Sequence, residues 1–251
     1  MFDPLKLAET MEKIVVKDRL RKYYRVARAG RWYGGSVAAD CVGCCLRCVF
    51  CWSGLPRDRP EDVGKFYAPE YVFRSLVRVA RKRRYRLLRI SGNEPTIGRR
   101  HLLEFLECLE GSDFIFILET NGILIGHDKS YARDLSKFSR VHVRVSLKGT
   151  CPEEFSRLTG AKPEFFEYQL KALQNLLDYG VSCHPAVMLS FSSKENRIKL
   201  MKRLQEIDPV LVEEFEEEYV FLYPHVVERL KRAGIKPLIA YTPDNIPAEL
   251  V

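Results

Sequence analysis

Short apolar runs alternate along the chain with longer amphipathic stretches. The apolar runs predict strands at residues 36–40, 87–90, 114–118, 141–147, 181–189 and 237–241. The amphipathic stretches predict helices at residues 69–84, 99–109, 130–138, 164–179, 194–217 and 223–233. Strands and helices in strict succession are typical of βαβ units, whose strands lie parallel.

Six such units predict an α/β fold with a mostly parallel sheet. Six strands are too few for the closed eight-stranded barrel, so the periodicity leaves an open barrel and a doubly wound sheet as alternatives. No low-complexity linker interrupts the alternation. We therefore expect one core domain, residues 36–251, and a basic amino-terminal extension, residues 1–35, that packs on it.

Unusual residues follow the first four predicted strands. A cysteine cluster follows the first, and the later segments are Ser91-Gly92-Asn93-Glu94, Glu119-Thr120-Asn121-Gly122 and Lys148-Gly149-Thr150. In parallel α/β folds the carboxyl ends of the strands meet at one rim, and ligands bind there. The four segments therefore predict a single site.

Five of the eight cysteines lie between residues 41 and 51, namely Cys41, Cys44, Cys45, Cys48 and Cys51. Such a dense cluster is typical of a metal site rather than of a disulfide framework. Two registers share one spacing, Cys44-x3-Cys48-x2-Cys51 and Cys41-x3-Cys45-x2-Cys48. Three thiolates can bind three irons of a [4Fe-4S] cluster and leave the fourth iron open, and an open position is the mark of a catalytic metal site.

Residues 44–51 read Cys-Cys-Leu-Arg-Cys-Val-Phe-Cys. This segment resembles the cluster loop of the radical S-adenosylmethionine superfamily, in which an aromatic residue, here Phe50, precedes the third cysteine. The resemblance favours Cys44, Cys48 and Cys51 as the metal ligands. The alternative is a structural zinc or a four-cysteine cluster, with Cys41 or Cys45 as the fourth ligand.

The resemblance also implies a binding site for S-adenosyl-L-methionine, held at the open iron by its amine and carboxylate. The family's Gly-Gly-Glu segment, whose backbone carbonyls bind the methionine amino group, corresponds here to Ser91, Gly92, Asn93 and Glu94. The side chains implied near the ribose and carboxylate are Thr120, Asn121, Ser146 and Lys148. His184 either reaches the cofactor or is a core histidine, and the Asn121-Gly122 pair also suits an ordinary turn.

The family resemblance further implies a partial (β/α)6 barrel and radical chemistry. A low-potential donor of the flavodoxin or ferredoxin type would reduce the cluster, and cleavage of S-adenosylmethionine would give a 5′-deoxyadenosyl radical that abstracts hydrogen from a substrate. The strand-end segments resemble those of glycyl-radical-enzyme activating proteins of the pyruvate formate-lyase activase type. An activase-like oxidoreductase or transferase acting on a protein partner is therefore the favoured function.

Charge adds a second hypothesis for the substrate. The chain has 41 Lys plus Arg against 33 Asp plus Glu, a net charge of +8. Two basic clusters, residues 13–31 and 81–86, carry neighbouring aromatics, which would suit RNA through phosphate neutralisation and base stacking. Solvated surface ion pairs explain the same clusters. RNA modification is the alternative function, and a non-catalytic iron–sulfur or zinc binding module is the third.

Apolar runs are all much shorter than the roughly 20 residues that a membrane span requires. The first four residues, Met-Phe-Asp-Pro, lack the basic flank and apolar stretch of an export signal. We therefore expect a cytoplasmic protein with no membrane span.

Overall fold

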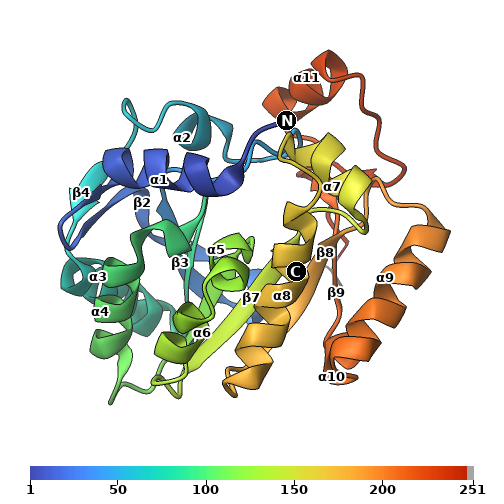
Figure 1. The fold of residues 1–251 in the computed structure, drawn as a ribbon. Coiled ribbons are helices and arrows are strands. Elements are labelled where there is room, and N and C mark those ends of the chain that lie inside the picture. Colours follow the sequence, from blue (N-terminus) through green and yellow to red (C-terminus); the bar gives the residue numbers. More distant parts are fainter. Residues whose placement is uncertain (248–251) are drawn as a thin grey trace.

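A curved nine-stranded sheet is the centre of the computed structural model, which describes residues 1–247 (Figure 1). Six of its strands run parallel, each paired with the next along the chain. They are β3 (Ser36–Cys41), β5 (Leu87–Ser91), β6 (Ile115–Thr120), β7 (Val141–Leu147), β8 (Cys183–Met188) and β9 (Glu216–Glu218). The mostly parallel α/β fold predicted from the sequence is confirmed.

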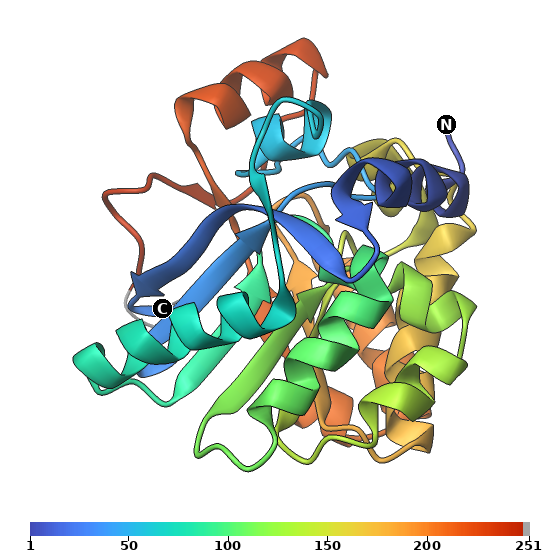
Figure 2. The ribbon, with the colours of Figure 1, turned by 90° about the vertical axis from the view of Figure 1, so that its left-hand side faces the viewer.

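The order of the parallel strands decides between the two predicted architectures. It follows the chain without reversal, whereas a doubly wound sheet reverses direction at a switch point. The main helices lie along the outer side of the curved sheet (Figures 1 and 2). They are α3 (Pro69–Arg83), α4 (Arg99–Leu109), α6 (Ser130–Leu135), α8 (Phe165–Asp178) and α9 (Lys194–Ile207). The architecture is therefore a partial barrel that does not close.

The amino-terminal segment extends this sheet. Helix α1 (Pro4–Val15) begins after Asp3, whose carboxylate accepts a hydrogen bond of 2.9 Å from the backbone N–H of Leu5. The long strand β2 (Leu20–Gly30) pairs antiparallel with β3 and also with β1 (Val16–Lys17) and β4 (Lys65–Tyr67). Residues 1–35 thus supply two strands of the sheet itself, β1 and β2, and the domain boundary at residue 35 stays a prediction.

Shorter elements complete the rim and the connections. They are η1 (Trp32–Gly34), α2 (Gly54–Asp58), η2 (Pro95–Gly98), α5 (Ile123–His127), α7 (Pro152–Thr159), α10 (Val210–Glu213), β10 (Val220–Phe221), α11 (Pro224–Arg232) and β11 (Ala240–Tyr241). Figures 1 and 2 show α2 and α11 beyond the same end of the sheet. Along residues 1–247 there is no helix long and apolar enough to cross a membrane.

The sixth parallel strand is not the predicted one. The predicted helix 194–217 ends at Ile207, and after the turn at Pro209 and helix α10 the chain forms β9, which pairs with β8. The predicted strand 237–241 supplies only the two residues of β11, in a separate small sheet with β10. Strand β9 escaped prediction because its three residues are glutamates, which are uncommon in strands.

His101 on α4 makes the fold sensitive to acid. Its Nε2 lies 2.9 Å from the Tyr23 hydroxyl and its Nδ1 lies 2.9 Å from the Arg19 carbonyl oxygen. Burial lowers the pKa of His101 to about 4, below the value of about 6.5 that histidine has in an unfolded chain. From about pH 6.5 down to about pH 4 the unfolded chain therefore binds a proton that the folded protein does not, which lowers the free energy of unfolding by up to about 3 kcal/mol.

Urea unfolding as a function of pH tests this expectation. The wild-type protein should lose more of its unfolding free energy over this interval than the His101→Gln variant, whose side chain does not titrate. Equal losses in the two proteins would show that His101 is protonated in the folded state.

Candidate active site

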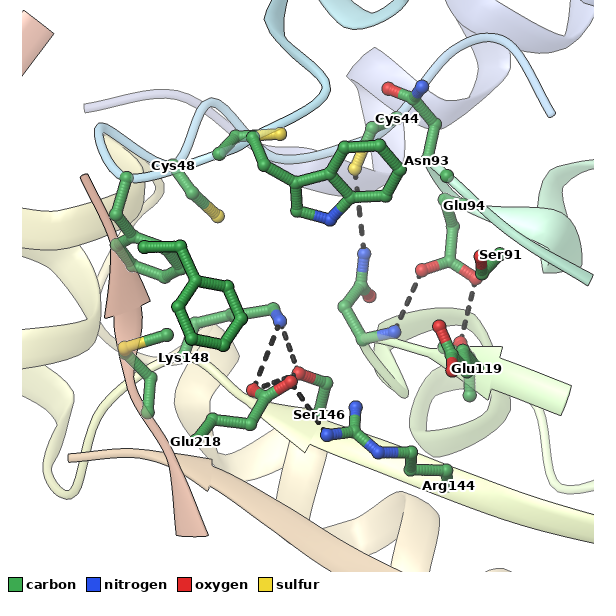
Figure 3. Close-up of a pocket in the computed structure, with 18 of the residues that line it drawn as sticks. Cys44, Cys48, Ser91, Asn93, Glu94, Glu119, Arg144, Ser146, Lys148 and Glu218 are labelled. Atoms are coloured by element: carbon green, nitrogen blue, oxygen red, sulfur yellow. Dashed lines mark hydrogen bonds and ion pairs between the residues drawn. The ribbon is translucent and has the colours of Figure 1, made fainter. Parts of the chain in front are cut away.

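A cavity of about 520 Å³ lies at the carboxyl ends of the parallel strands, and Figure 3 looks into it. Each of the six parallel strands contributes to its wall, either directly or through the loop that follows. All but one of the site residues expected from the sequence line it, namely Cys44, Cys48, Phe50, Cys51, Ser91, Gly92, Asn93, Glu94, Thr120, Asn121, Ser146 and Lys148. The four predicted rim segments therefore meet in one site.

The cysteines divide into two groups at this wall. Cys44, Cys48 and Cys51 line the cavity, and Figure 3 shows Cys44 and Cys48 on the same side of it. Cys41 and Cys45 are both 0% exposed and lie in the core instead. In the described part of the chain no three His, Cys, Asp or Glu side chains already form a metal-binding group. The role of the three lining cysteines as ligands stays a prediction.

The cysteine loop is held from outside by backbone hydrogen bonds. The N–H of Arg47 donates to the carbonyl of Thr159 at 3.2 Å, and that of Val49 donates to the carbonyl of Leu158 at 2.9 Å. Both carbonyls belong to the last turn of α7, where they have no partner within the helix. The carboxyl end of α7 thus serves as the support of the loop.

Two arginines and a lysine set the electrostatics of this loop. Arg57 donates to the carbonyl of Cys48, and Arg229 on α11 donates to that of Cys51. Burial raises the pKa of the Cys48 thiol to about 12, while the charges of Lys148 and Arg57 act against this rise. A metal ion that binds here must displace the thiol proton, and the flanking cations stabilise the thiolate.

Glu94 joins three loops of the rim. Its carboxylate accepts hydrogen bonds from the hydroxyls of Thr96 at 2.6 Å and Thr120 at 2.7 Å, and from the backbone N–H of Asn121 at 2.8 Å. Its own N–H donates to the carbonyl of Gly43 in the cysteine loop at 3.0 Å. The side chains of Glu94 and Thr120 are therefore engaged within the protein, and their direct contact with a cofactor stays a prediction.

Asn121 connects the end of β6 to the cysteines. Its Nδ2 lies 3.3 Å from the sulfur of Cys45 and 3.9 Å from that of Cys44. Its Oδ1 accepts a hydrogen bond of 3.1 Å from the N–H of Ile123 at the start of α5. The side chain therefore positions the cysteine loop as well as lining the cavity.

Gly92 brings the loop after β5 close to β3. Its φ is +96°, and a Cβ at this position would lie 2.9 Å from the Cα of Asp40. The Gly92→Ala variant is expected to displace this loop and to weaken S-adenosylmethionine binding about tenfold or more, because both the backbone conformation and the space exclude a side chain.

Gly111 provides a matched control, since it also has a positive φ, +74°, but nothing lies within 4 Å of an added Cβ. Equilibrium dialysis with labelled S-adenosylmethionine should show a loss of affinity in Gly92→Ala and none in Gly111→Ala. Equal affinities in the two variants would refute the role of Gly92 at the cofactor.

Ser146 and Lys148 belong to an ionic group on the opposite side of the cavity from Cys44 and Cys48 (Figure 3). Glu218 accepts a hydrogen bond of 2.6 Å from Ser146, and its carboxylate lies 2.8 Å from Arg144 and 3.8 Å from the Lys148 ammonium. Burial acts to raise the pKa of Glu218, but Arg144 and Lys148 outweigh it and hold that pKa below its ordinary value. The group therefore presents fixed charges of both signs.

His184 is the expected site residue that does not line the cavity. Its Nε2 lies 2.9 Å from the carboxylate of Glu216, and its Nδ1 lies 2.6 Å from Nε2 of His142. The side chain is buried against Glu216, which itself lines the wall. Of the two roles considered for His184, the structure favours the core histidine.

Sequence reasoning missed the charged residues inside the barrel. Arg89, Arg144, Glu216 and Glu218 all line the cavity. The signal was present in β7, where buried valines alternate with polar residues, because alternate residues of a strand face opposite sides. Two of the three glutamates of β9 fall inside the predicted helix 194–217, so no strand pattern marks them as residues of the site.

The residues present fit the cofactors that the resemblance implies. Three thiols at one wall supply the donors that iron–sulfur clusters take. Beside them, Oδ1 of Asn93 is buried and has no hydrogen-bond partner among residues 1–247, while its Nδ2 donates to the carbonyl of Cys41 at 3.0 Å. A buried acceptor without a donor suits the amino group of S-adenosylmethionine.

An open barrel of six parallel strands with a cysteine loop at its carboxyl rim defines a class of enzyme. The family model of the radical SAM superfamily matches residues 40–204, more than half of the chain. The chain therefore belongs to the radical SAM superfamily, whose cofactors are a [4Fe-4S] cluster and S-adenosylmethionine.

Curated relatives match the chain over part of its length. A probable GTP 3′,8-cyclase of Methanosarcina acetivorans is 30% identical over 140 residues, which are 55% of this chain and 40% of the relative. The S-adenosyl-L-methionine-dependent tRNA 4-demethylwyosine synthase of Methanocaldococcus jannaschii is 24% identical over 169 residues, 57% of this chain and 51% of the relative. The chain thus spans about half the length of these relatives or less.

A solved structure shares the fold. SuiB of Streptococcus suis bound to S-adenosylmethionine superposes with a TM-score of 0.58 and 17% identity, and the match covers 83% of this chain and 52% of SuiB. At this identity the similarity concerns the fold alone.

Proposed function

We propose that this radical SAM enzyme holds its [4Fe-4S] cluster through Cys44, Cys48 and Cys51. The observation that carries the proposal is that these three cysteines line the cavity, whereas the neighbouring Cys41 and Cys45 are fully buried outside it. When bound and reduced, the cluster supplies the electron that cleaves S-adenosylmethionine and so yields the 5′-deoxyadenosyl radical for hydrogen abstraction.

The chain's own residues bind and orient S-adenosylmethionine. Asn93, whose Oδ1 is unpartnered, lines the cavity with Ser91 and Gly92; this Oδ1 and the backbone carbonyls of Ser91 and Gly92 would accept hydrogen bonds from the cofactor's amino group. The Lys148 ammonium attracts its carboxylate, because charge-assisted hydrogen bonds are the stronger ones. Ser146 and Asn121 offer polar groups to the ribose.

Aromatic packing supplies an apolar part of the cavity wall beside the cysteines. The ring of Phe50 packs on Phe191 with 5.7 Å between centroids, and both rings are buried. Apolar side chains at this place would help to exclude water and so protect a reactive radical from side reactions with solvent.

Reductive cleavage of S-adenosylmethionine tests the proposed function. The anaerobically reconstituted protein, given dithionite and S-adenosylmethionine, is expected to form 5′-deoxyadenosine and methionine. No product should form when dithionite is omitted. A protein that carries its cluster and yields no 5′-deoxyadenosine would instead be a binding module, the non-catalytic alternative.

A protein partner is the substrate expected from the sequence, in the manner of the glycyl-radical-enzyme activating proteins. Two of the relatives are named for GTP and for tRNA, so neither name supports an activase. The protein substrate stays a prediction, as do the flavodoxin- or ferredoxin-type donor and the cytoplasmic location. Mass changes after anaerobic incubation with a cell extract would identify the substrate, and a change confined to RNA or small molecules would contradict a protein.

The two basic clusters give little support to the RNA alternative, for different reasons. In the first cluster, Arg19 pairs with Glu104, Lys22 donates to the Pro60 carbonyl, and Arg28 pairs with Asp40 inside the protein. In the second, residues 81–84 at the end of α3 are exposed, but they precede β5 and therefore lie at the amino ends of the strands, away from the cavity. RNA is the weaker candidate.

A further inference from the structure

We propose that Arg28, Arg89 and Arg144 form a subsite for an anionic group, a phosphate or a carboxylate, of a small substrate inside the barrel. This inference rests on the proposed function, because it places the substrate in the same cavity as the cofactors.

The three arginines come from three strands and face one space. Arg28 lies on β2, Arg89 on β5 and Arg144 on β7, and all three line the cavity. In the sheet, Ala38 of β3 pairs with Arg28 on one side and with Arg89 on the other. The single methyl group of Ala38 between them leaves room for both guanidinium groups on the inner face.

Each guanidinium retains hydrogen-bond donors that no carboxylate uses. Arg28 binds Asp40 through Nε and Nη2 at 2.9 and 3.0 Å, and Arg144 binds Glu216 through Nε and Nη2 at 2.9 and 2.6 Å. These bonds leave Nη1 of both arginines for a ligand, since a guanidinium has five N–H donors.

Arg89 carries the clearest unused donor. Its Nη1 lies 3.4 Å from the Ser36 hydroxyl and its Nη2 bonds to Glu119. Its Nε is buried and has no partner in the described chain. A buried N–H without an acceptor costs about 1–3 kcal/mol, and a bound anion would remove that cost.

The charges around Arg89 also favour an anion. Burial lowers the pKa of Arg89 to about 10, and the nearby positive charges of Arg144 and Arg28 add to this effect. Asp40 acts against this lowering but does not cancel it, whereas carboxylates hold the pKa of Arg28 and that of Arg144 above their ordinary values. Arg89 is therefore the arginine of the three whose charge is least offset. An anion placed beside Arg89 would stabilise its charge.

The side of the barrel is covered, which limits the size of the substrate. Residues of η1 reach from the amino-terminal strand across to the last strands: the rings of Trp32 and Phe221 lie 5.9 Å apart, and the Tyr33 hydroxyl donates to Glu216 at 3.2 Å. The Tyr33 ring also covers Arg89, at 5.2 Å. A cavity of about 520 Å³ that also holds S-adenosylmethionine leaves room for a small molecule only.

Calorimetric titration of the holoenzyme with S-adenosylmethionine present tests the subsite, with inorganic pyrophosphate and citrate as probes. Arg89→Lys and Arg144→Lys keep the positive charge that pairs with Glu119 and Glu216, so the fold should be retained. Lysine, however, lacks the planar set of N–H donors with which a guanidinium binds an anion. At least one probe should bind to wild type and bind about tenfold or more weakly to both variants. Arg86→Lys is the matched control, because Arg86 is exposed and pairs with Asp113.

The outcomes distinguish a failure of the anion subsite from a failure of the proposed radical SAM activity. Binding of pyrophosphate alone indicates a phosphate and binding of citrate alone a carboxylate. Failure of both probes, or equal affinity in wild type and both lysine variants, overturns the subsite. The same wild-type preparation is assayed for 5′-deoxyadenosine: if it forms the product but binds neither anion, only the subsite fails, whereas a protein that forms none contradicts the proposed function itself.

Discussion

Replacing Cys48 with alanine is expected to remove the iron from anaerobically purified protein and to lower 5′-deoxyadenosine formation at least about a hundredfold. Loss of a residue that only supports a metal ligand typically lowers metal affinity or activity about 10–100-fold. Loss of a ligand itself should cost more, and Cys48 is the middle member of the three cysteines that line the cavity. Iron and sulfide analysis, the visible absorbance of the protein and the product assay measure the effect.

Cys41, at the end of β3, and Cys45, within the loop, supply the controls, since both are buried without lining the cavity. Cys41→Ala and Cys45→Ala should keep their iron, with at most a modest loss of stability from the removed sulfur. Equal loss of iron in Cys41→Ala and Cys48→Ala would make Cys41 a ligand, and would contradict the register Cys44, Cys48 and Cys51 as the complete ligand set. Loss in Cys45→Ala alone would make Cys45 a ligand.

Glu94→Gln is expected to lower the free energy of unfolding by about 2–4 kcal/mol and to weaken S-adenosylmethionine binding about tenfold or more. The carboxylate accepts from two hydroxyls and the backbone N–H of Asn121. An amide in its place turns one acceptor oxygen into a donor, so a buried donor faces another donor and the rim segments separate.

Urea unfolding and equilibrium dialysis measure the two effects of Glu94→Gln. Glu206→Gln removes the same charge from an exposed position on α9 and should change neither quantity by more than about 0.5 kcal/mol. If Glu94→Gln unfolds and binds S-adenosylmethionine as wild type does, the carboxylate does not hold the rim together.

The fold could be predicted where apolar runs mark buried strands. The run Val141–Leu147 became β7 with the same bounds, and the helix 99–109 was also placed correctly. Strand β9 could not be found, because Glu216–Glu218 forms a strand only through its pairing with β8. Long-range pairing overrides local propensity there.

The rim of the site was predictable and the interior was not. Residues after parallel strands meet at the carboxyl ends by topology, which brought Cys44, Asn93 and Asn121 together. Arg144 and Ser146 alternate with buried valines, a pattern that ordinarily indicates a strand with one face in water. Only the curvature of the sheet turns that polar face into an enclosed cavity.

Electron paramagnetic resonance of the reduced wild-type protein, recorded before and after addition of S-adenosylmethionine, tests the central claim most directly. Three cysteine ligands leave one iron open, so the spectrum should be that of a reduced [4Fe-4S] cluster and should change when S-adenosylmethionine binds. A cluster spectrum that S-adenosylmethionine leaves unchanged, or a protein that takes up zinc in place of iron, would contradict the account.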